Sequence, residues 1–466
     1  MAGKDASFRW LDRARDRPGP IYLALAQALE AAIREGELQP GDQLPPQRAV
    51  AERLGVDFTT VTRAYGAARA RGLVEGTAGR GTFVRARADE DDAGLVDLTM
   101  NLPPPPQGVS LGALLRDTTR AVLERGDPAT LMSYHPGAGT LGQKVAAAAW
   151  LAPVLGQLAP ERLLIAPGAQ AALSAVLAAF TRPGQALVVE PLTYPGLKAA
   201  ASLHGLALIP CPVDDQGFMP EDLERLCAGP AIAGVYLVPT AQNPTATVMG
   251  LARRRDVARI VQAAGVWLIE DDPYSRLFDV PLPGLATLAP ERAFHIATLS
   301  KTLSPGLRTA FVAPPPGEAA MRLAEALRAT ALMPAPLMSA VVAGWIRDGD
   351  ADALLAGVRR EARARRALAA RILPQARGPA EAIHVWLDLP GHGSPADLRL
   401  MGQSRGLSLV AADAFAVADA PSRPGVRISL GGPAKQSVLV AALTALADLA
   451  RAARPPGAGG APGLVV

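Results

Sequence analysis

The sequence contains little cysteine and histidine and no pattern of metal ligands. Its 466 residues include 2 cysteines and 5 histidines. Because so few cysteines cannot form a disulfide framework, we expect Cys211 and Cys227 to be small buried side chains in a reducing compartment. The histidines lack the spacing of metal ligands, so we expect no metal site.

Long apolar segments are missing as well. The longest apolar run, 145–156, is short and contains Pro153, whereas a spanning helix needs about 20 apolar residues. The first thirty residues are charged, are interrupted at 18–20 by Pro-Gly-Pro, and hold no apolar signal-peptide core. We therefore expect a cytoplasmic protein without a membrane span.

Apolar residues as a class are nevertheless abundant, at 49% of the chain against 19% charged residues. A chain of this length and composition can bury a large core in two or three folding units. Its net charge of +4 lies entirely in residues 1–88, where 14 Lys and Arg stand against 10 Asp and Glu. A small basic unit joined to a neutral larger one predicts a polyanion-binding domain followed by a domain of another kind.

The amino-terminal pattern begins with residues 1–17, whose mixed charge predicts a polar tail. Apolar residues then recur at helical spacing from Pro20 to Gly36 and predict an amphipathic helix. A turn and a short helix over 47–54 follow, and Gly55 ends that helix.

Only three residues separate the helix over 47–54 from the next helix, which we expect to begin at Phe58 or Thr59 and to run to Arg71. Two helices joined by so short a turn are typical of a helix-turn-helix. The Gly-rich segment 76–81, between two apolar segments, predicts a hairpin wing. Taken alone, this pattern also fits a three-helix domain with no DNA role.

The motifs at 44–56, 59–65, 71–73 and 79–84 closely resemble the GntR-type winged helix-turn-helix, and the resemblance covers residues 18–86. It implies that Arg48 and the start of the second helix hold DNA phosphates. The residues that it places in the grooves are Thr59, Thr60, Thr62 and Arg63 in the major groove and the wing-tip residues Gly79 and Arg80 in the minor groove.

One departure from that family lies at the entry to the recognition helix. Asp57-Phe58 stands where the family commonly has a Ser-Arg or Thr-Arg pair. The change removes a guanidinium able to read guanine or to clamp a phosphate. Arg63 and Arg80 are the residues that could compensate, although Arg63 also fits an ordinary solvated helix position.

Residues 87–97, which include the acidic run 89–92, predict a linker. Fully extended, a linker of this length reaches roughly 40 Å. That reach is enough for the DNA-binding domain of one chain to lie over a partner subunit.

Residues 98–452 show short apolar strands alternating with Ala-rich and Leu-rich helices, the pattern of a mainly parallel α/β sheet with helices on both faces. The expected strands lie at 163–168 (with a turn, before a helix over 169–180), 186–190, 235–238, 266–270, 293–297 and 311–313. Polar residues follow the carboxyl ends of these strands, where open α/β sheets bind ligands.

The remainder of the chain predicts helix and then a smaller domain. We expect helical structure over 336–376, in which the Arg-rich run 359–371 fits a solvated helix face better than a nucleic-acid patch. Strands and helices of a smaller carboxyl-terminal α+β subdomain follow, and the Pro/Gly-rich residues 453–466 predict a disordered tail.

Lys301 lies just after the apolar run 293–297, between hydroxyl-bearing residues and seven positions before Arg308. A lysine amine can form a Schiff base with an aldehyde, while hydroxyls and a guanidinium can grip a phosphate. An ordinary exposed Lys and Arg in a loop would look the same. The interpretation as a cofactor site therefore depends on partners elsewhere in the chain.

Those partners follow other strands, and their order from Tyr134 to Arg427 resembles fold-type I pyridoxal-phosphate enzymes of the aminotransferase kind. The resemblance implies an internal aldimine between Lys301 and pyridoxal 5'-phosphate, with Asp271 at the pyridine nitrogen. The other implied cofactor contacts are Tyr194 stacked on the ring, Asn243 and Tyr274 at the ring 3-hydroxyl, Ala169, Gln170, Thr298, Ser300 and Arg308 around the phosphate, and Tyr134 at the phosphate of the neighbouring subunit. Arg427 matches the arginine that binds a substrate α-carboxylate.

Two positions depart from that family. The Gly that usually follows the Asn-Pro-Thr motif at Asn243 is missing. Asn101 stands where these enzymes often have a Gly, and its side chain is expected to narrow the substrate mouth. Catalytic turnover is for this reason a weaker expectation than cofactor binding.

A GntR-like domain ahead of an aminotransferase-like domain resembles the MocR/GabR family of transcriptional regulators. The resemblance implies a homodimer that binds double-stranded operator DNA and senses an amine, an amino acid or pyridoxal phosphate through Lys301. Two alternatives stay open: a working aminotransferase with an accessory DNA-binding domain, and a cofactor-free repressor that uses the large domain only to dimerise. The sequence indicates neither the effector and operator nor whether transcription is activated or repressed.

Overall fold

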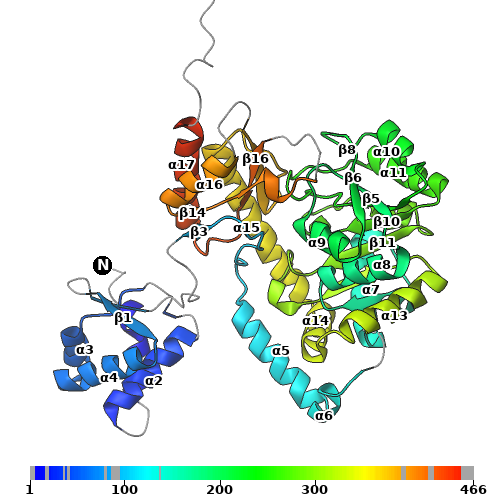
Figure 1. The fold of residues 1–466 in the computed structure, drawn as a ribbon. Coiled ribbons are helices and arrows are strands. Elements are labelled where there is room, and N and C mark those ends of the chain that lie inside the picture. Colours follow the sequence, from blue (N-terminus) through cyan, green and yellow to red (C-terminus); the bar gives the residue numbers. More distant parts are fainter. Residues whose placement is uncertain are drawn as a thin grey trace, which may run out of the picture. The chain divides into compact units, whose positions relative to one another are not determined.

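The structure is a computed structural model, and it describes residues 6–15, 20–34, 37–38, 42–77, 81–84, 95–135, 138–389, 395–417 and 424–452. The chain divides into two compact units, Met1–Ala93 and Gly94–Val466 (Figure 1). Within the described ranges, no helix is long and apolar enough to cross a membrane.

The amino-terminal unit consists of short helices and one β-hairpin. Its elements are η1 (Ala6–Leu11), α1 (Asp12–Arg15), α2 (Ile21–Arg34), α3 (Gln47–Leu54), α4 (Phe58–Ala70), β1 (Val74–Thr77) and β2 (Gly81–Val84). β1 and β2 pair antiparallel, with Val74 opposite Val84. Gly55 ends α3 with φ 67°, a left-handed conformation that glycine adopts without steric cost. The predicted helix-turn-helix and wing are therefore present.

Residues 6–15 differ from the prediction of a polar tail over 1–17. They form η1 and α1, and Trp10 and Leu11 are 0% and 1% exposed. Both side chains belong to the same apolar core as Leu25 and Leu29 of α2. The prediction was wrong for this segment because two apolar side chains among charged residues give no periodic signal, although they pack against α2.

The second unit is built on a seven-stranded sheet with the order β4-β12-β11-β10-β9-β5-β6. The strands are β4 (Leu164–Ala166), β5 (Ala186–Val189), β6 (Ala207–Pro210), β9 (Ile232–Leu237), β10 (Trp267–Asp271), β11 (Ala293–Thr298) and β12 (Ala310–Ala313). Neighbouring strands from β11 to β6 are parallel, and β12 is antiparallel to both of its neighbours. The expected strands and their mainly parallel sheet are confirmed.

Helices cover both faces of this sheet. Alternate residues of one strand enter different cores: Tyr236 and Ile269 pack in one cluster, and Leu237 and Leu268 in the other. This alternation follows from the two-residue period of a strand. The helices of this region are α5 (Leu111–Arg125), α6 (Pro128–Leu131), α7 (Leu141–Leu155), α8 (Ala169–Phe180), α9 (Pro195–Leu203), α10 (Pro220–Cys227), α11 (Leu251–Ala264), α12 (Leu285–Leu288), α13 (Glu318–Ala331) and α14 (Pro336–Asp348).

A smaller subdomain packs beside the large sheet within the same unit. Its sheet has the order β13-β16-β15, and a separate parallel pair joins β3 to β14. The elements are β3 (Val96–Asp97), α15 (Asp350–Ile372), β13 (His384–Asp388), α16 (Pro395–Ser404), β14 (Leu407–Ser408), β15 (Val410–Ala411), β16 (Gly425–Ser429) and α17 (Gln436–Ala452). A short hairpin of β7 (Val213–Asp214) and β8 (Gly217–Phe218) completes the strands of the described chain.

The Arg-rich run of α15 is packed in part, although Arg360 and Arg371 are exposed. Arg365 is 1% exposed and lies 2.6 Å from Glu361, and Arg359 donates to the carbonyl oxygens of Arg276 and Phe278. The expectation of a solvated helix face was wrong for these side chains because α15 contacts other parts of the unit along its length. The guanidinium groups act as hydrogen-bond donors inside the fold.

Candidate cofactor site and DNA-binding surface

The recognition helix α4 begins with a side-chain cap. Asp57 Oδ1 accepts hydrogen bonds from the Thr59 amide at 2.7 Å and from the Thr59 hydroxyl at 2.6 Å. Both bonds hold the pKa of Asp57 below its usual value. The departure from the family pattern at this position thus has a local reason, because Asp is a favoured N-cap that leaves the helix start well ordered.

The predicted DNA-contact residues of α4 lie at its surface, but Thr62 and Arg63, like Thr59, have partners within the unit. Thr59, Thr62 and Arg63 are exposed and Thr60 is half-buried. The Thr62 hydroxyl lies 2.8 Å from Gln47 Oε1 on α3. The Arg63 guanidinium lies 4.5 Å from the centre of the Tyr22 ring, so it packs back on α2.

A groove next to these residues joins α3, α4 and the wing. Its lining includes Arg48, Phe58 and Thr82, and Arg48 is exposed. The Tyr65 hydroxyl donates to the Pro45 carbonyl at 2.9 Å and so fixes the turn that leads into α3. Gly79 and Arg80, which were predicted at the wing tip, lie outside the described residues.

Asp271 ends strand β10 in the interior of the second unit and is 7% exposed. Its Oδ2 accepts a 2.7 Å hydrogen bond from the Tyr236 hydroxyl on the neighbouring strand. Among the described residues its Oδ1 has no hydrogen-bond partner. Burial raises the pKa of Asp271 to about 6, against the lowering effect of Tyr236. This free buried oxygen fits a ring N–H, which is the contact that pyridoxal phosphate requires.

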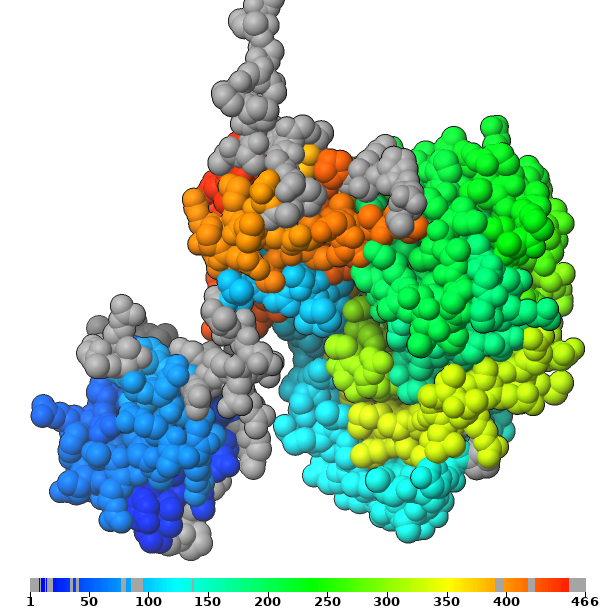
Figure 2. All heavy atoms as spheres, in the orientation of Figure 1, coloured from blue at the N-terminus to red at the C-terminus, as the bar shows by residue number. Residues whose placement is uncertain are grey.

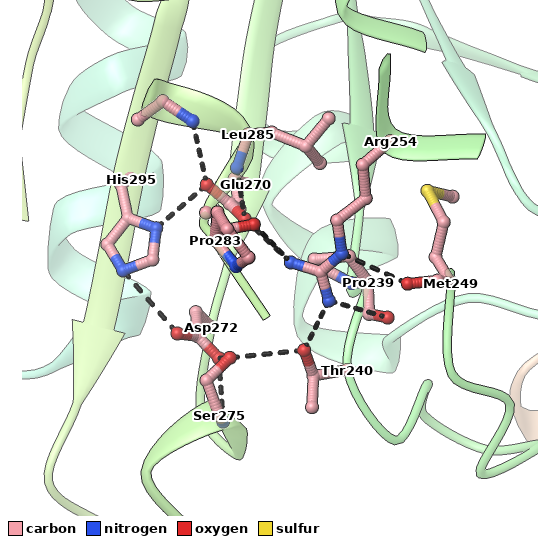
Figure 3. A network of polar contacts seen from close by, with 12 residues as sticks. Pro239, Thr240, Met249, Arg254, Glu270, Asp272, Ser275, Pro283, Leu285 and His295 are labelled. Atoms are coloured by element: carbon pink, nitrogen blue, oxygen red, sulfur yellow. Dashed lines mark hydrogen bonds and ion pairs between the residues drawn. The ribbon is translucent and has the colours of Figure 1, made fainter. Parts of the chain in front are cut away.

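A buried polar network holds the residues on either side of Asp271. In Figure 3 the two ring nitrogens of His295 are directed to Glu270 and to Asp272, at 2.8 and 3.5 Å. Although burial opposes a charge on His295, Glu270 raises its pKa. Arg254, 3.8 Å from Glu270, adds a second cation. Because adjacent strand residues point to opposite faces, this network anchors the end of β10 from behind while Asp271 faces the site.

Lys301 follows β11, and its Nζ donates to the Asn101 carbonyl at 2.6 Å. Burial first, and then the nearby charge of Arg427, lower the pKa of Lys301 to about 8. A lysine with this pKa is partly uncharged at neutral pH, which is the form that attacks an aldehyde.

The amino end of α8 and Arg308 form an anion-binding cup. Gly168 precedes the helix with φ 102°, and no side chain caps the first turn that begins at Ala169 and Gln170. A Cβ at Gly168 would lie 2.6 Å from Nη2 of Arg308, so the guanidinium lies directly against this backbone. Thr298 and Ser300 are buried and bonded to each other at 3.0 Å. Free helix amides beside a guanidinium suit a phosphate.

Arg427 of β16 is 7% exposed and is held from two sides. Its Nη1 donates to Asn243 Oδ1 at 2.7 Å and its Nη2 to the Thr99 carbonyl. Its Nε is buried without a partner among the described residues. Tyr194 is half-buried, and the pKa of its hydroxyl is raised by burial first and then by Asp271. The structure thus brings the predicted cofactor residues other than Tyr134 into one region of the second unit.

Tyr134 is the exception. It lies in the loop after α6 and is 79% exposed. Among the described residues, no hydrogen bond joins its side chain to the site of its own chain. The implied role of Tyr134 at the phosphate of a neighbouring subunit stays a prediction.

Sequence analysis missed Tyr236 and His384 at the site, and it did not anticipate the hydrogen bonds of Asn101. Tyr236 is the hydroxyl partner of Asp271 and lies on β9 opposite Ile269; its place as a polar aromatic inside the apolar strand expected over 235–238 was the available signal. Asn101 Nδ2 donates to the Tyr274 hydroxyl at 2.8 Å and lies 3.0 Å from His384 Nδ1. His384 Nε2 faces the Gln242 carbonyl at 3.1 Å, so it carries the proton and leaves Nδ1 as the acceptor.

Asn101 thus forms hydrogen bonds within the site, a role beyond the predicted narrowing of the substrate mouth. Because the Tyr274 hydroxyl accepts from Asn101, its own proton is free for another acceptor, as the implied contact with the ring 3-oxygen requires. The pKa of Tyr274 is raised by burial, which keeps that proton on the hydroxyl.

Both units match known families. Residues 21–84 match bacterial regulatory proteins of the gntR family, and residues 94–442 match aminotransferase class I and II. The uncharacterized HTH-type transcriptional regulator YdeF of Bacillus subtilis is 34% identical over 89% of this chain and 91% of its own. The probable rhizopine catabolism regulatory protein MocR of Rhizobium meliloti is 29% identical over 72% of this chain and 73% of its own.

The fold of the second unit is also that of solved aminotransferases. LysN, an α-aminoadipate aminotransferase from Thermus thermophilus, superposes with a TM-score of 0.70 at 23% identity, covering 82% of this chain and 97% of that one. Pyridoxal phosphate is the cofactor of this fold type, and the free Asp271 oxygen, the Gly168 cup and Lys301 fit it. With a gntR-type DNA-binding domain, a fold-type I aminotransferase domain and a full-length regulator as relative, the chain belongs to the MocR/GabR family of transcriptional regulators.

Proposed function

We propose that this regulator senses an amino compound or pyridoxal phosphate at the site of Lys301 and adjusts its affinity for operator DNA accordingly. The observation that carries the proposal is the buried Asp271 carboxylate with one free oxygen, in a region that also contains Lys301 and the phosphate cup. A buried carboxylate without a cationic or N–H partner is unfavourable, so a ring N–H at this place compensates its desolvation.

Pyridoxal phosphate supplies, when bound, an aldehyde carbon that condenses with primary amines and a ring that withdraws electrons. Asp271 would hold the ring nitrogen, Arg308 and the first turn of α8 the phosphate, and Tyr194 the ring face. Tyr274, oriented by Asn101, would donate to the ring oxygen.

An arriving amino acid would meet Arg427 as well as Lys301. The free Nε of Arg427 and its Nη2 give a carboxylate two donors, and binding there requires the Thr99 carbonyl to yield Nη2. Lys301, with a pKa of about 8, can take up or release the proton that the amine exchanges. Thr99 follows closely on the linker segment that leads to the DNA-binding unit. Release of its carbonyl by Arg427 would therefore couple effector binding to that segment.

We infer a homodimer from the surface around α5. No residue of this helix is fully buried, and large apolar side chains nearby are exposed: Leu115, Leu123, Met132, Leu141 and Val145. Figure 2 shows the α5 region, in cyan, at the surface of its unit. Large apolar side chains exposed in this number are typical of a protein interface. Tyr134, two residues after Met132, is also exposed and would reach the phosphate of the partner subunit.

The test combines two readouts on one protein. Purified full-length protein is titrated with pyridoxal phosphate and then with amino acids and amines, while cofactor absorption and binding to its own upstream DNA are followed. We expect one class of amine to change both readouts together. If no amine, amino acid or added pyridoxal phosphate changes either cofactor absorption or DNA binding, sensing is refuted. As a regulator that binds chromosomal DNA, the protein is expected in the cytoplasm.

A second candidate function is transamination. The lowered pKa of Lys301 favours it, because a lysine that changes charge near neutral pH can also move the α-proton of a bound amino acid. Repeated turnover of amino and keto acids without any specific DNA site would identify the chain as an enzyme with an accessory DNA-binding domain.

A further inference from the structure

A cavity of about 290 Å³ lies between the large sheet and the carboxyl-terminal subdomain. Its walls include the apolar side chains of Leu192, Val238, Met249 and Trp386. The residues Lys301, Asp271 and Arg427 do not line it. It is therefore a separate space from the cofactor site, and its size suits a small organic molecule.

One polar group that lines this cavity is the carboxyl of Glu190, which follows β5 and is 5% exposed. Its Oε2 accepts a 3.2 Å hydrogen bond from Gln242 Nε2, and the Val238 amide also donates to the carboxyl. No ion pair to Glu190 forms within the described ranges. Burial raises the pKa of Glu190 to about 8, although both hydrogen bonds oppose the shift.

The charges at the mouth of the cavity are already paired. Asp214 lies 2.8 Å from Arg253, and Arg377 bridges Asp388 at 2.6 Å and Asp215 at 3.4 Å. Glu190 thus differs from its neighbours, because it is a buried acid that meets hydrogen-bond donors but, among the described residues, no cation. A cation that enters the cavity would stabilise its ionised form.

We propose that this cavity is a second small-molecule site, which binds a compact apolar ammonium compound through a charge pair with Glu190. The apolar walls receive the hydrocarbon body and the carboxylate receives the nitrogen. The site does not depend on amine chemistry at Lys301 and stands whether or not the proposed sensing is correct.

The probe is N,N-dimethylcyclohexylamine, a cation at neutral pH whose tertiary nitrogen cannot form an imine with the cofactor. Its control is 1-cyclohexylethanol, which has the same heavy-atom skeleton without the charge. Calorimetric titration of the full-length, cofactor-loaded protein is expected to show one site per chain for the amine. The alcohol is expected to bind about tenfold more weakly or not at all.

Two variants locate the site. Glu190→Gln removes the charge, and Val213→Phe narrows the mouth at a lining residue that is 39% exposed; each is expected to weaken amine binding about tenfold or more. Val280→Phe, at a valine 87% exposed outside the cavity lining, is the matched control.

Absence of amine binding to the wild-type protein would overturn the proposal, and so would equal binding of amine and alcohol. Full binding by Glu190→Gln or by Val213→Phe would place the probe elsewhere and overturn the proposal too. The primary-amine titration that tests sensing at Lys301 does not enter this experiment, so either proposal can fail alone.

Discussion

Removal of the Tyr236 hydroxyl should change the pH range in which the protein holds its cofactor. The hydroxyl donates to Asp271 Oδ2 at 2.7 Å in a fully buried setting, and a hydrogen bond to a buried charged group contributes about 1.5–3 kcal/mol. Tyr236→Phe removes this bond from the carboxylate form alone. Because one pKa unit corresponds to about 1.4 kcal/mol, the pKa of Asp271 should rise by about 1 to 2 units above its present value.

The direction of the effect follows from the charge state of Asp271. Its carboxylate form binds the ring N–H of the cofactor, and this form is lost as the pH falls through the Asp271 pKa of about 6. Asp272 raises this pKa further, whereas His295 and Lys301 lower it. Cofactor affinity should therefore decline below about pH 6 in the wild type and already at higher pH in Tyr236→Phe.

The assay is the dissociation constant of pyridoxal phosphate across a pH series, read from cofactor absorption. The cofactor phosphate also titrates in this range, but it does so equally in both proteins, so the shift between them is the informative quantity. Tyr65→Phe, which removes a buried tyrosine hydrogen bond in the amino-terminal unit, is the control and should follow the wild type. An identical midpoint in wild type and Tyr236→Phe would refute the reasoning about Asp271.

Three further substitutions test other parts of the molecule. Lys301→Ala should abolish the visible absorption of lysine-bound cofactor and keep the oligomeric state, checked by spectroscopy and size-exclusion chromatography; a persisting absorption would assign the cofactor to another lysine. Arg427→Lys should weaken binding of a carboxylate-bearing amino acid about tenfold or more while sparing the amine that lacks the carboxylate, since lysine offers no planar pair of donors; equal losses would exclude a carboxylate contact. Arg48→Ala should weaken DNA binding on all sequences and reduce the salt dependence by about one counterion; unchanged binding would place the phosphate contacts elsewhere.

The elements of the fold were readable from local patterns. The helix over 47–54 and the helix over 169–180 agree with α3 and α8 to the residue, because a glycine or a strand-end turn marks each boundary in the sequence. Residues 6–15 were misjudged because two apolar side chains in a charged segment give no periodic signal. Their burial depends on α2, which offers the surface that they cover.

By itself, the sequence determined the two-domain organisation and the succession of strands along the chain. It also identified the candidate site residues Lys301, Asp271, Asn243 and Arg427. Both were possible because motif spacing and strand periodicity are local properties of the chain. Only the tertiary structure decided that the Tyr236 hydroxyl bonds to Asp271 and that Asn101 links Tyr274 to His384. It also decided that Glu190 lines a second cavity without an ion-pair partner among the described residues. These groups come from distant segments, so no window of the sequence contains both partners. Their roles arise from burial and from the direction of each hydrogen bond, which exist only once the segments pack together.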